Sequence, residues 1–189
     1  MLYGFKEDIN QKTMNFGEMI ARTAELLEKE TEDDEFFLGQ LKHAVNTAYM
    51  TVARDKWRPA AAEEMCVCKG KIPIAELSEC FVGLKSVKWN GLRVGAWAGK
   101  DFIHVCENIQ KVIVEYYYLP VPMEEDEDEP VIPFAQVDPY AYIYFAASLY
   151  CSIRHLHAEA AVWDSRYRNV VDNVKEVRSG FTLPAGRWR

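Results

Sequence analysis

The sequence predicts an α+β protein: a helical body of two N-terminal and two C-terminal helices, an inserted antiparallel β module and an extended C-terminal arm. Three observations lead to this prediction. Apolar residues recur at helical spacing in residues 15–57 and 138–177. Strand-forming residues, separated by turn signals, fill residues 61–119. An acidic loop flanked by prolines, residues 120–137, separates the strands from the second helical part.

The length of 189 residues, with 49% hydrophobic residues, is enough for one full core. We therefore expect residues 1–178 to form a single domain that contains the β module, and residues 179–189 to form the arm. The first ten residues include Lys6, Glu7 and Asp8, so they lack the apolar stretch of a secretion signal. No window approaches the roughly 20 apolar residues of a membrane helix, and a cytosolic origin is the simplest interpretation.

Residues 15–30 are predicted to form the first helix. Asn15 is a good N-cap, and Glu18 follows at the spacing of a capping box. The second helix runs to about Trp57 and ends before Pro59. Because only a short acidic linker separates the two helices, we expect an antiparallel hairpin. The apolar stripe of the first helix consists of Phe16, Met19, Ile20, Thr23, Leu26 and Leu27.

The middle of the chain is predicted to form an antiparallel meander of about five strands, or a sandwich. Asn90-Gly91 is a strong hairpin signal, because both residues tolerate positive φ. Pro73 restricts its short segment to a sheet edge. The extended segments are residues 63–69, 72–74, 80–89, 92–98, 101–107 and 111–119.

Asp138-Pro139 is a strong helix start, with Asp as N-cap and Pro at the first helical position. Residues 140–157 are apolar almost all round and small on one side, so we expect this helix to be buried against both its own domain and a neighbouring subunit. A second helix should cover residues 159–177. The break between residues 156 and 159 is inferred from a change of pattern, because no Gly or Pro marks it.

The cysteines are odd in number, which favours free, buried thiols over a disulfide framework. In a strand, Cys66 and Cys68 would point to the same face. Their spacing is not the C-x₂₋₄-C of common zinc modules. The alternative interpretation is a small cytosolic metal-binding or regulatory protein. Its ligands would come from Cys66, Cys68, Cys80, His104 and Cys106.

Motifs of common enzyme classes are absent from the sequence, including the P-loop, GxGxxG, HExxH and GxSxG. His155 and His157 are two residues apart, which on a helix would point them away from each other. His104 and Cys106 share a strand face, but no third group nearby in sequence would orient them. We therefore predict no enzyme, no catalytic residue, no metal site and no cofactor.

The formal net charge is −7 and the pI is about 5.2. A protein that grips nucleic acid by its phosphates usually has a basic face. DNA near this protein is therefore expected to pass without specific binding. The acidic loop, expected to be exposed or mobile, contains Glu124, Glu125, Asp126, Glu127, Asp128 and Glu129.

The C-terminal arm combines apolar residues with Arg187-Trp188-Arg189, a composition typical of interface anchors. The arm has no helical or strand periodicity, yet it contains large apolar residues of kinds that are usually buried. We therefore predict that the arm docks on a partner. The predicted contact residues are Phe181, Leu183, Pro184, Arg187, Trp188 and Arg189.

Residues 112–177 resemble bacteriophage head–tail adaptor proteins, also called connector or tail-accessory proteins. In that family a strand with a V-x-Y-x-x-x-P-like ending runs into an acidic loop with prolines, then an alanine-rich helix and a second helix rich in Arg, Tyr and acids. Here these parts are Val114-Glu115-Tyr116 through Pro120, then residues 124–133, 138–157 and 159–177. The β segments are most similar to the larger adaptors, which have a β-sandwich insertion.

The resemblance implies a virion structural protein that is assembled in the host cytoplasm and forms a ring of twelve copies on the portal protein. The C-terminal arm would pack against portal subunits, and the β module would face outward or toward tail components, which are tail tube, nozzle or fibre proteins. The acidic loop would line a channel through which DNA slides without sticking.

Overall fold

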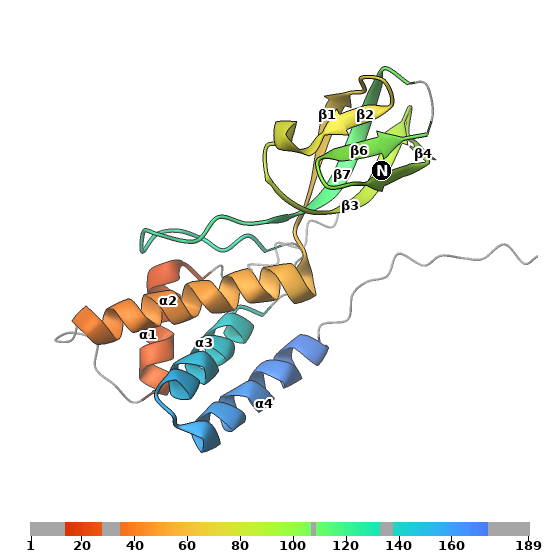
Figure 1. Cartoon of the computed structure of the whole chain (residues 1–189). Helices are drawn as coiled ribbons and strands as arrows, with labels where there is room; N and C mark the ends of the chain where they lie inside the picture. Colours follow the sequence, from red (N-terminus) through yellow and green to blue (C-terminus); the bar gives the residue numbers. More distant parts are fainter. Residues whose placement is uncertain (1–13, 28–34, 107–108, 133–137, 174–189) are drawn as a thin grey trace, which may run out of the picture.

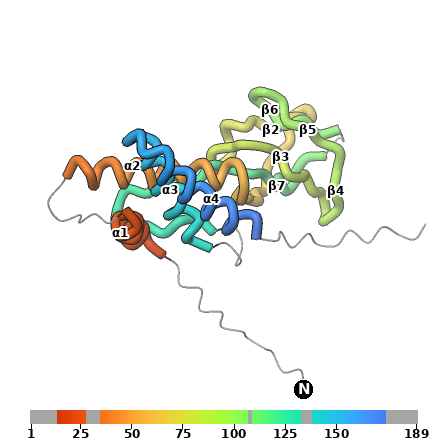
Figure 2. The backbone as a smooth tube through the Cα atoms, turned by 90° about the horizontal axis from the view of Figure 1, so that it is seen from below, coloured from red at the N-terminus to blue at the C-terminus, as the bar shows by residue number. Residues whose placement is uncertain are grey.

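The computed structural model describes residues 14–27, 35–106, 109–132 and 138–173. The predicted fold class is confirmed: two N-terminal helices, antiparallel sheets in the middle, and two C-terminal helices that pack with the N-terminal ones (Figure 1). The β module lies beyond the C-terminal end of α2 and beside the helical body in both views (Figures 1 and 2). Each of the two parts encloses a hydrophobic core of its own.

The helical body contains the four predicted helices, and α1 and α3 begin at the predicted capping residues. Asn15 caps α1, because its Oδ1 accepts the Glu18 N–H at 2.8 Å. Asp138 Oδ1 accepts the Tyr140 N–H at 3.0 Å at the start of α3. A π-helical turn, Ala53–Trp57, continues α2 up to the region of Pro59. The helices are α1 (Phe16–Leu26), α2 (Glu35–Val52), α3 (Tyr140–Ile153) and α4 (His157–Asn173).

The predicted antiparallel hairpin of α1 and α2 is wrong. In Figure 1 α1 runs across α2, and in Figure 2 α1 is seen nearly end-on while α2 runs across the picture from left to right. The buried stripe of α1, including Phe16 and Met19, belongs to a core shared with α2 and α3, and α1 contacts both helices. A crossing orientation lets one short helix cover two neighbours at once.

Helix α3 is the centre of the helical body, and its burial is supplied by the same chain. It packs against α1, α2 and α4. Ala141, Ala146 and Ala147 have no exposed surface within the single subunit. These small side chains are therefore covered within the subunit, and the expected contact of this helix with a neighbouring subunit stays a prediction.

The break between α3 and α4 lies at residues 154–156, earlier than predicted. His155 has a φ of 59°, its N–H donates to the Ser152 carbonyl at 3.1 Å, and the Leu156 N–H donates to the Cys151 carbonyl at 2.8 Å. This is the Schellman motif that glycine usually completes. Because His155 lies in this turn, its ring centroid is 6.0 Å from that of His157, and the prediction that the two rings point apart is wrong.

Replacing His155 with glycine should stabilise the protein. A side chain at positive φ costs roughly 1–2 kcal/mol, which the entropy of an added glycine offsets in part by roughly 0.5–1 kcal/mol. We expect a gain of about 0.5 kcal/mol in the free energy of unfolding, measured by urea denaturation. His157→Gly is the matched control and should destabilise the protein, because residue 157 begins α4. A loss of stability in His155→Gly would contradict the capping role of this turn.

The β module consists of two antiparallel sheets, with strand orders β1-β7-β3-β4 and β2-β6-β5. Strands β3 and β7 have the predicted bounds, and β2 lies at a sheet edge as Pro73 requires. The Asn90-Gly91 hairpin is confirmed, with φ of 48° and 80°. The strands are β1 (Ala60–Cys66), β2 (Lys71–Pro73), β3 (Cys80–Trp89), β4 (Leu92–Val94), β5 (Ala96–Ala98), β6 (Phe102–Val105) and β7 (Lys111–Leu119).

The meander alternative is wrong, because β7 pairs with both β1 and β3. The predicted strand at residues 92–98 divides at Gly95, and its halves β4 and β5 belong to different sheets. The two sheets enclose one core, to which Ile72, Ile103 and Val114 contribute fully buried side chains. This arrangement agrees with the sandwich alternative.

Tyr116 links three parts of the β module. Its buried hydroxyl donates to the Glu63 carboxylate on β1 and accepts the Glu79 N–H at 3.2 Å, next to the start of β3. Burial first, and then the bond to Glu63, raises the pKa of Tyr116 to about 12. The phenol therefore stays protonated and continues to donate.

Candidate functional site

The described part of the acidic loop, residues 120–132, is held against the helical body. The Asn46 side-chain amide on α2 donates to the Met123 carbonyl at 2.8 Å, and its oxygen accepts the Met123 N–H at 2.9 Å. The Tyr49 hydroxyl accepts the Val131 N–H at 3.0 Å. The Met123 side chain is buried in the helical core. The loop is thus exposed, as predicted, but it is anchored at several points rather than loosely attached.

The N-terminus of α1 forms a second anchor for the loop. The Phe16 N–H donates to the Asp128 carbonyl at 2.8 Å, and the Gly17 N–H donates to the Asp126 carbonyl at 2.9 Å. These are first-turn donors that a helix cannot satisfy internally, and the positive end of the helix favours the acidic segment. A Cβ on Gly17 would lie 3.1 Å from the Asp126 Cβ. The close approach therefore depends on glycine at this position.

Two aspartates shape the loop itself. Asp128 Oδ2 accepts the N–H groups of Glu124 at 2.7 Å and Glu125 at 2.9 Å, and these bonds hold the pKa of Asp128 below its ordinary value. The Lys42 ammonium on α2 lies 3.3 Å from the Asp126 carboxylate. Glu124, Glu125 and Glu127 remain exposed. The loop therefore presents a preorganised row of carboxylates.

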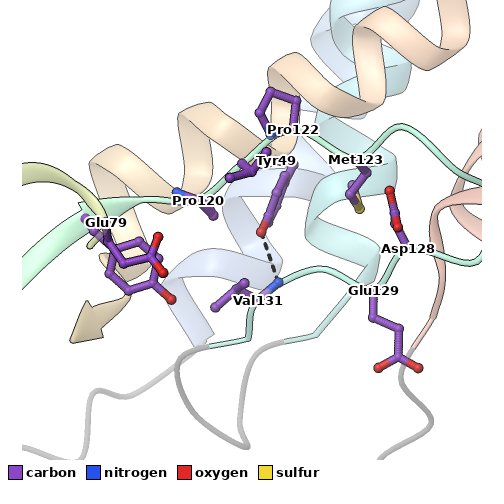
Figure 3. A pocket seen from close by; sticks show the side chains of 10 residues that line it. Tyr49, Glu79, Pro120, Pro122, Met123, Asp128, Glu129 and Val131 are labelled. Carbon is purple, nitrogen blue, oxygen red and sulfur yellow. Dashed lines mark hydrogen bonds between the residues drawn. The ribbon is translucent and has the colours of Figure 1, made fainter. Parts of the chain in front are cut away.

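A cavity of about 350 Å³ lies beside the loop, where the β module meets the helical body (Figure 3). Tyr49, Tyr118 and Pro120 form part of its wall, and the carboxylates of Glu79 and Glu129 also line it. Burial raises the pKa of Tyr49, and burial together with the nearby Glu79 raises the pKa of Tyr118. Phenols, prolines and carboxylates of this kind suit the binding of apolar or cationic groups.

The structure does not bring the predicted metal ligands together. Cys66 pairs with Lys111 and Cys80 with Leu119, which places them at opposite ends of β7, about 27 Å apart at 3.4 Å per residue. His104 stacks on Trp97, with ring centroids 4.9 Å apart. In the described part of the chain, no three His, Cys, Asp or Glu side chains are grouped so that they could hold a metal ion.

The prediction of buried thiols is correct only for Cys151. The other four cysteines, Cys66, Cys68, Cys80 and Cys106, are exposed. Cys66 and Cys80 lie on the solvent-facing side of the first sheet, opposite the face that carries the core. Cysteine is usually buried, so composition alone indicated the opposite.

The predicted contact residues of the arm fall outside the described residues. These are Phe181, Leu183, Pro184, Arg187, Trp188 and Arg189. Conversely, the sequence interpretation missed the residues that anchor the acidic loop: Gly17, Lys42, Asn46 and Tyr49. The available signal was Asn46, because asparagine in a helix interior is unfavourable unless its side chain has a partner.

Comparison with models of known protein families and with curated proteins found no match for this chain. Among the described residues, no helix combines the length and apolar character needed to cross a membrane.

Proposed function

We propose that this chain is a virion structural protein, a subunit of a head–tail adaptor ring that binds the portal, extends the DNA channel and gives tail components a platform. The observation that carries the proposal is the continuous unit β7, acidic loop, α3 and α4. These elements follow one another in the same order as the parts on which the resemblance to adaptor proteins rests. Here the loop is anchored to the helical body through Asn46 and α1.

The division into two cores supports this role. The helical body has its own core and could form the rigid part of a ring. The β module has a separate core, projects from the helical body and is available to a different partner. Large apolar side chains are exposed on both parts, including Phe36 on α2 and Trp97 on β5. Exposed aromatic residues of this kind are enriched at protein interfaces.

The charge distribution supports passage of DNA rather than its capture. The chain carries a formal net charge of −7, and pairing between copies leaves the summed charge of a ring unchanged. A ring of such copies would have a strong negative net charge, which would repel phosphates and keep the duplex from adhering to the wall.

The test is assembly on the portal. The full-length chain, monomeric alone, should form a collar of twelve copies when mixed with the portal protein of its virus, as seen by electron microscopy. A chain lacking residues 182–189 should keep its fold, measured by circular dichroism, but lose portal binding. The matched control replaces residues 182–189 with a Gly/Ser segment of equal length and should behave like the truncation.

Two results would contradict the proposal. A truncated chain that still assembled on portals would show that the arm does not dock there. A full-length chain that formed a stable dimer indifferent to portal protein would argue against the adaptor function itself.

A further inference from the structure

The sheet β1-β7-β3-β4 has one face on the core of the β module and one open face. Along β7, Val112, Val114 and Tyr116 are buried, while the alternating residues Ile113 and Tyr117 lie on the other side of the strand. The strand register places Lys88 of β3 opposite Ile113, and Arg93 of β4 opposite Lys88. These side chains therefore share the open face.

The open face is basic in an otherwise acidic protein. Its cations are Lys85, Lys88, Arg93 and Lys111, and its carboxylates are Glu64 and Glu115. Glu115 pairs with Lys88, and Glu64 lies 3.5 Å from the Lys111 ammonium. The Lys85 ammonium lies 6.0 Å from the centre of the Tyr117 ring. Cations thus exceed carboxylates on this face, whereas the chain as a whole carries a charge of −7.

A hollow of about 670 Å³ lies at the end of the open face near the β3–β4 turn. Lys88 and Lys111 are among its lining residues, and so are Ile113 and Trp89. The side chains of Ile113 and Trp89 are 44% and 43% exposed. Glu64 also lines the hollow and pairs with Lys111, as Glu115 pairs with Lys88, so the excess positive charge comes from the neighbouring Lys85 and Arg93. Apolar surface beside this excess charge fits a segment that combines carboxylates with apolar side chains.

We propose that this open face is the docking surface for the acidic loop of a second copy of the chain. The loop has the complementary pattern, because the exposed Glu124, Glu125 and Glu127 lie between the exposed apolar residues Val121 and Val131. The anchors at Asn46 and α1 hold the loop in one shape, so docking costs little ordering entropy. The inference deepens the proposed function, on which it rests, by naming the contact between ring subunits.

Geometry within one chain excludes the same contact in cis. Ile113 lies near the start of β7, and the loop begins beyond the other end of this strand. The six residues from Ile113 to Leu119 span about 20 Å of extended strand, and the loop is held against α1 and α2. A contact between two different surfaces is heterologous, and its repetition closes a ring when the rotation between copies allows it.

The contact is tested by zero-length carbodiimide cross-linking of the full-length chain, without portal protein and at low salt, because cross-linking traps brief contacts between copies that are monomeric at equilibrium. An equal mixture of ¹⁵N-labelled and unlabelled chain identifies cross-links between copies by mass spectrometry. We expect cross-links from Lys85, Lys88 or Lys111 to Glu124, Glu125 or Glu127, and roughly a tenfold loss at high salt, a ratio equivalent to about 1.4 kcal/mol. Equal yields at Lys69 and Lys100 of the same module would overturn the proposal.

Charge reversal supplies the decisive comparison. The double variants Lys85→Glu with Arg93→Glu, and Glu125→Lys with Glu127→Lys, should each lose the cross-link between copies by about tenfold. An equal mixture of the two variants should recover it, because the reversed loop of one then faces the reversed sheet of the other. The control Lys69→Glu with Lys100→Glu should leave the yield unchanged.

Failure of the mixture to recover cross-linking would overturn the docking proposal. Because no portal protein is present in this experiment, the result would not bear on the adaptor function, which the portal-assembly experiment tests separately. Conversely, if the mixture recovers cross-linking but the chain never assembles on portals, the contact between copies is supported and the adaptor function is refuted.

Discussion

Replacing Tyr142 with alanine is expected to destabilise the helical body by about 3–5 kcal/mol, the cost of truncating a large buried aromatic residue. The Tyr142 side chain on α3 is 1% exposed. Its ring makes edge contacts with Tyr49 at 5.7 Å and with Trp57 at 5.3 Å between ring centroids. The substitution would open a cavity where α3, α2 and the π-helical turn meet. Such a loss is a large share of the roughly 5–15 kcal/mol that stabilises a domain.

Hydrogen exchange followed by residue measures this effect and shows where it acts. Amides of α2 and α3 should lose protection, while amides of β3 and β7 should keep it, because the β module has a separate core. Tyr140→Ala on the same helix is the control and should cost less than about 1 kcal/mol, since this side chain is exposed. Equal loss of protection in both parts would show that the two cores unfold as one unit.

Replacing Asn46 with alanine is expected to release the acidic loop and to cost about 2–3 kcal/mol. The substitution leaves both the N–H and the carbonyl of Met123 without their partner, and an unsatisfied buried polar group costs roughly 1–3 kcal/mol. Hydrogen exchange of residues 120–132 should rise, and cross-linking between copies should fall because the loop is no longer held in shape.

His43→Ala is the matched control for Asn46. His43 is exposed on the same helix, and its removal should change the free energy of unfolding by less than about 0.5 kcal/mol. If Asn46→Ala left exchange of the loop unchanged, the contacts of Tyr49 and α1 alone would be sufficient to hold it.

Local signals predicted most element boundaries well. Asn15 and Asp138 begin helices through hydrogen bonds to residues two or three positions away, and Asn90-Gly91 forms its hairpin because both residues adopt positive φ. The bounds of β3 and β7 followed from runs of strand-forming residues. The turn at His155 was placed too late, because a histidine in the left-handed region has no sequence signature as clear as glycine.

The sequence predicted only part of the candidate site. The acidic run from Glu124 to Glu129 is evident in the sequence, but the residues that anchor it are not, because Asn46 and Met123 are 77 positions apart. The same applies to the basic face, whose cations come from β3, β4 and β7 and are brought together by strand register. A shift of one residue in that register would move them to the other face.

The sequence by itself determined the α+β class, the order of helices and strands, and the position of the acidic loop, because periodicity, caps and turns act over a few residues. Only the tertiary structure decided the strand order, the crossing of α1 over α2, the burial of α3 within its own subunit and the anchoring of the loop. Each of these depends on contacts between distant residues, and many arrangements of the same elements satisfy the local rules equally well.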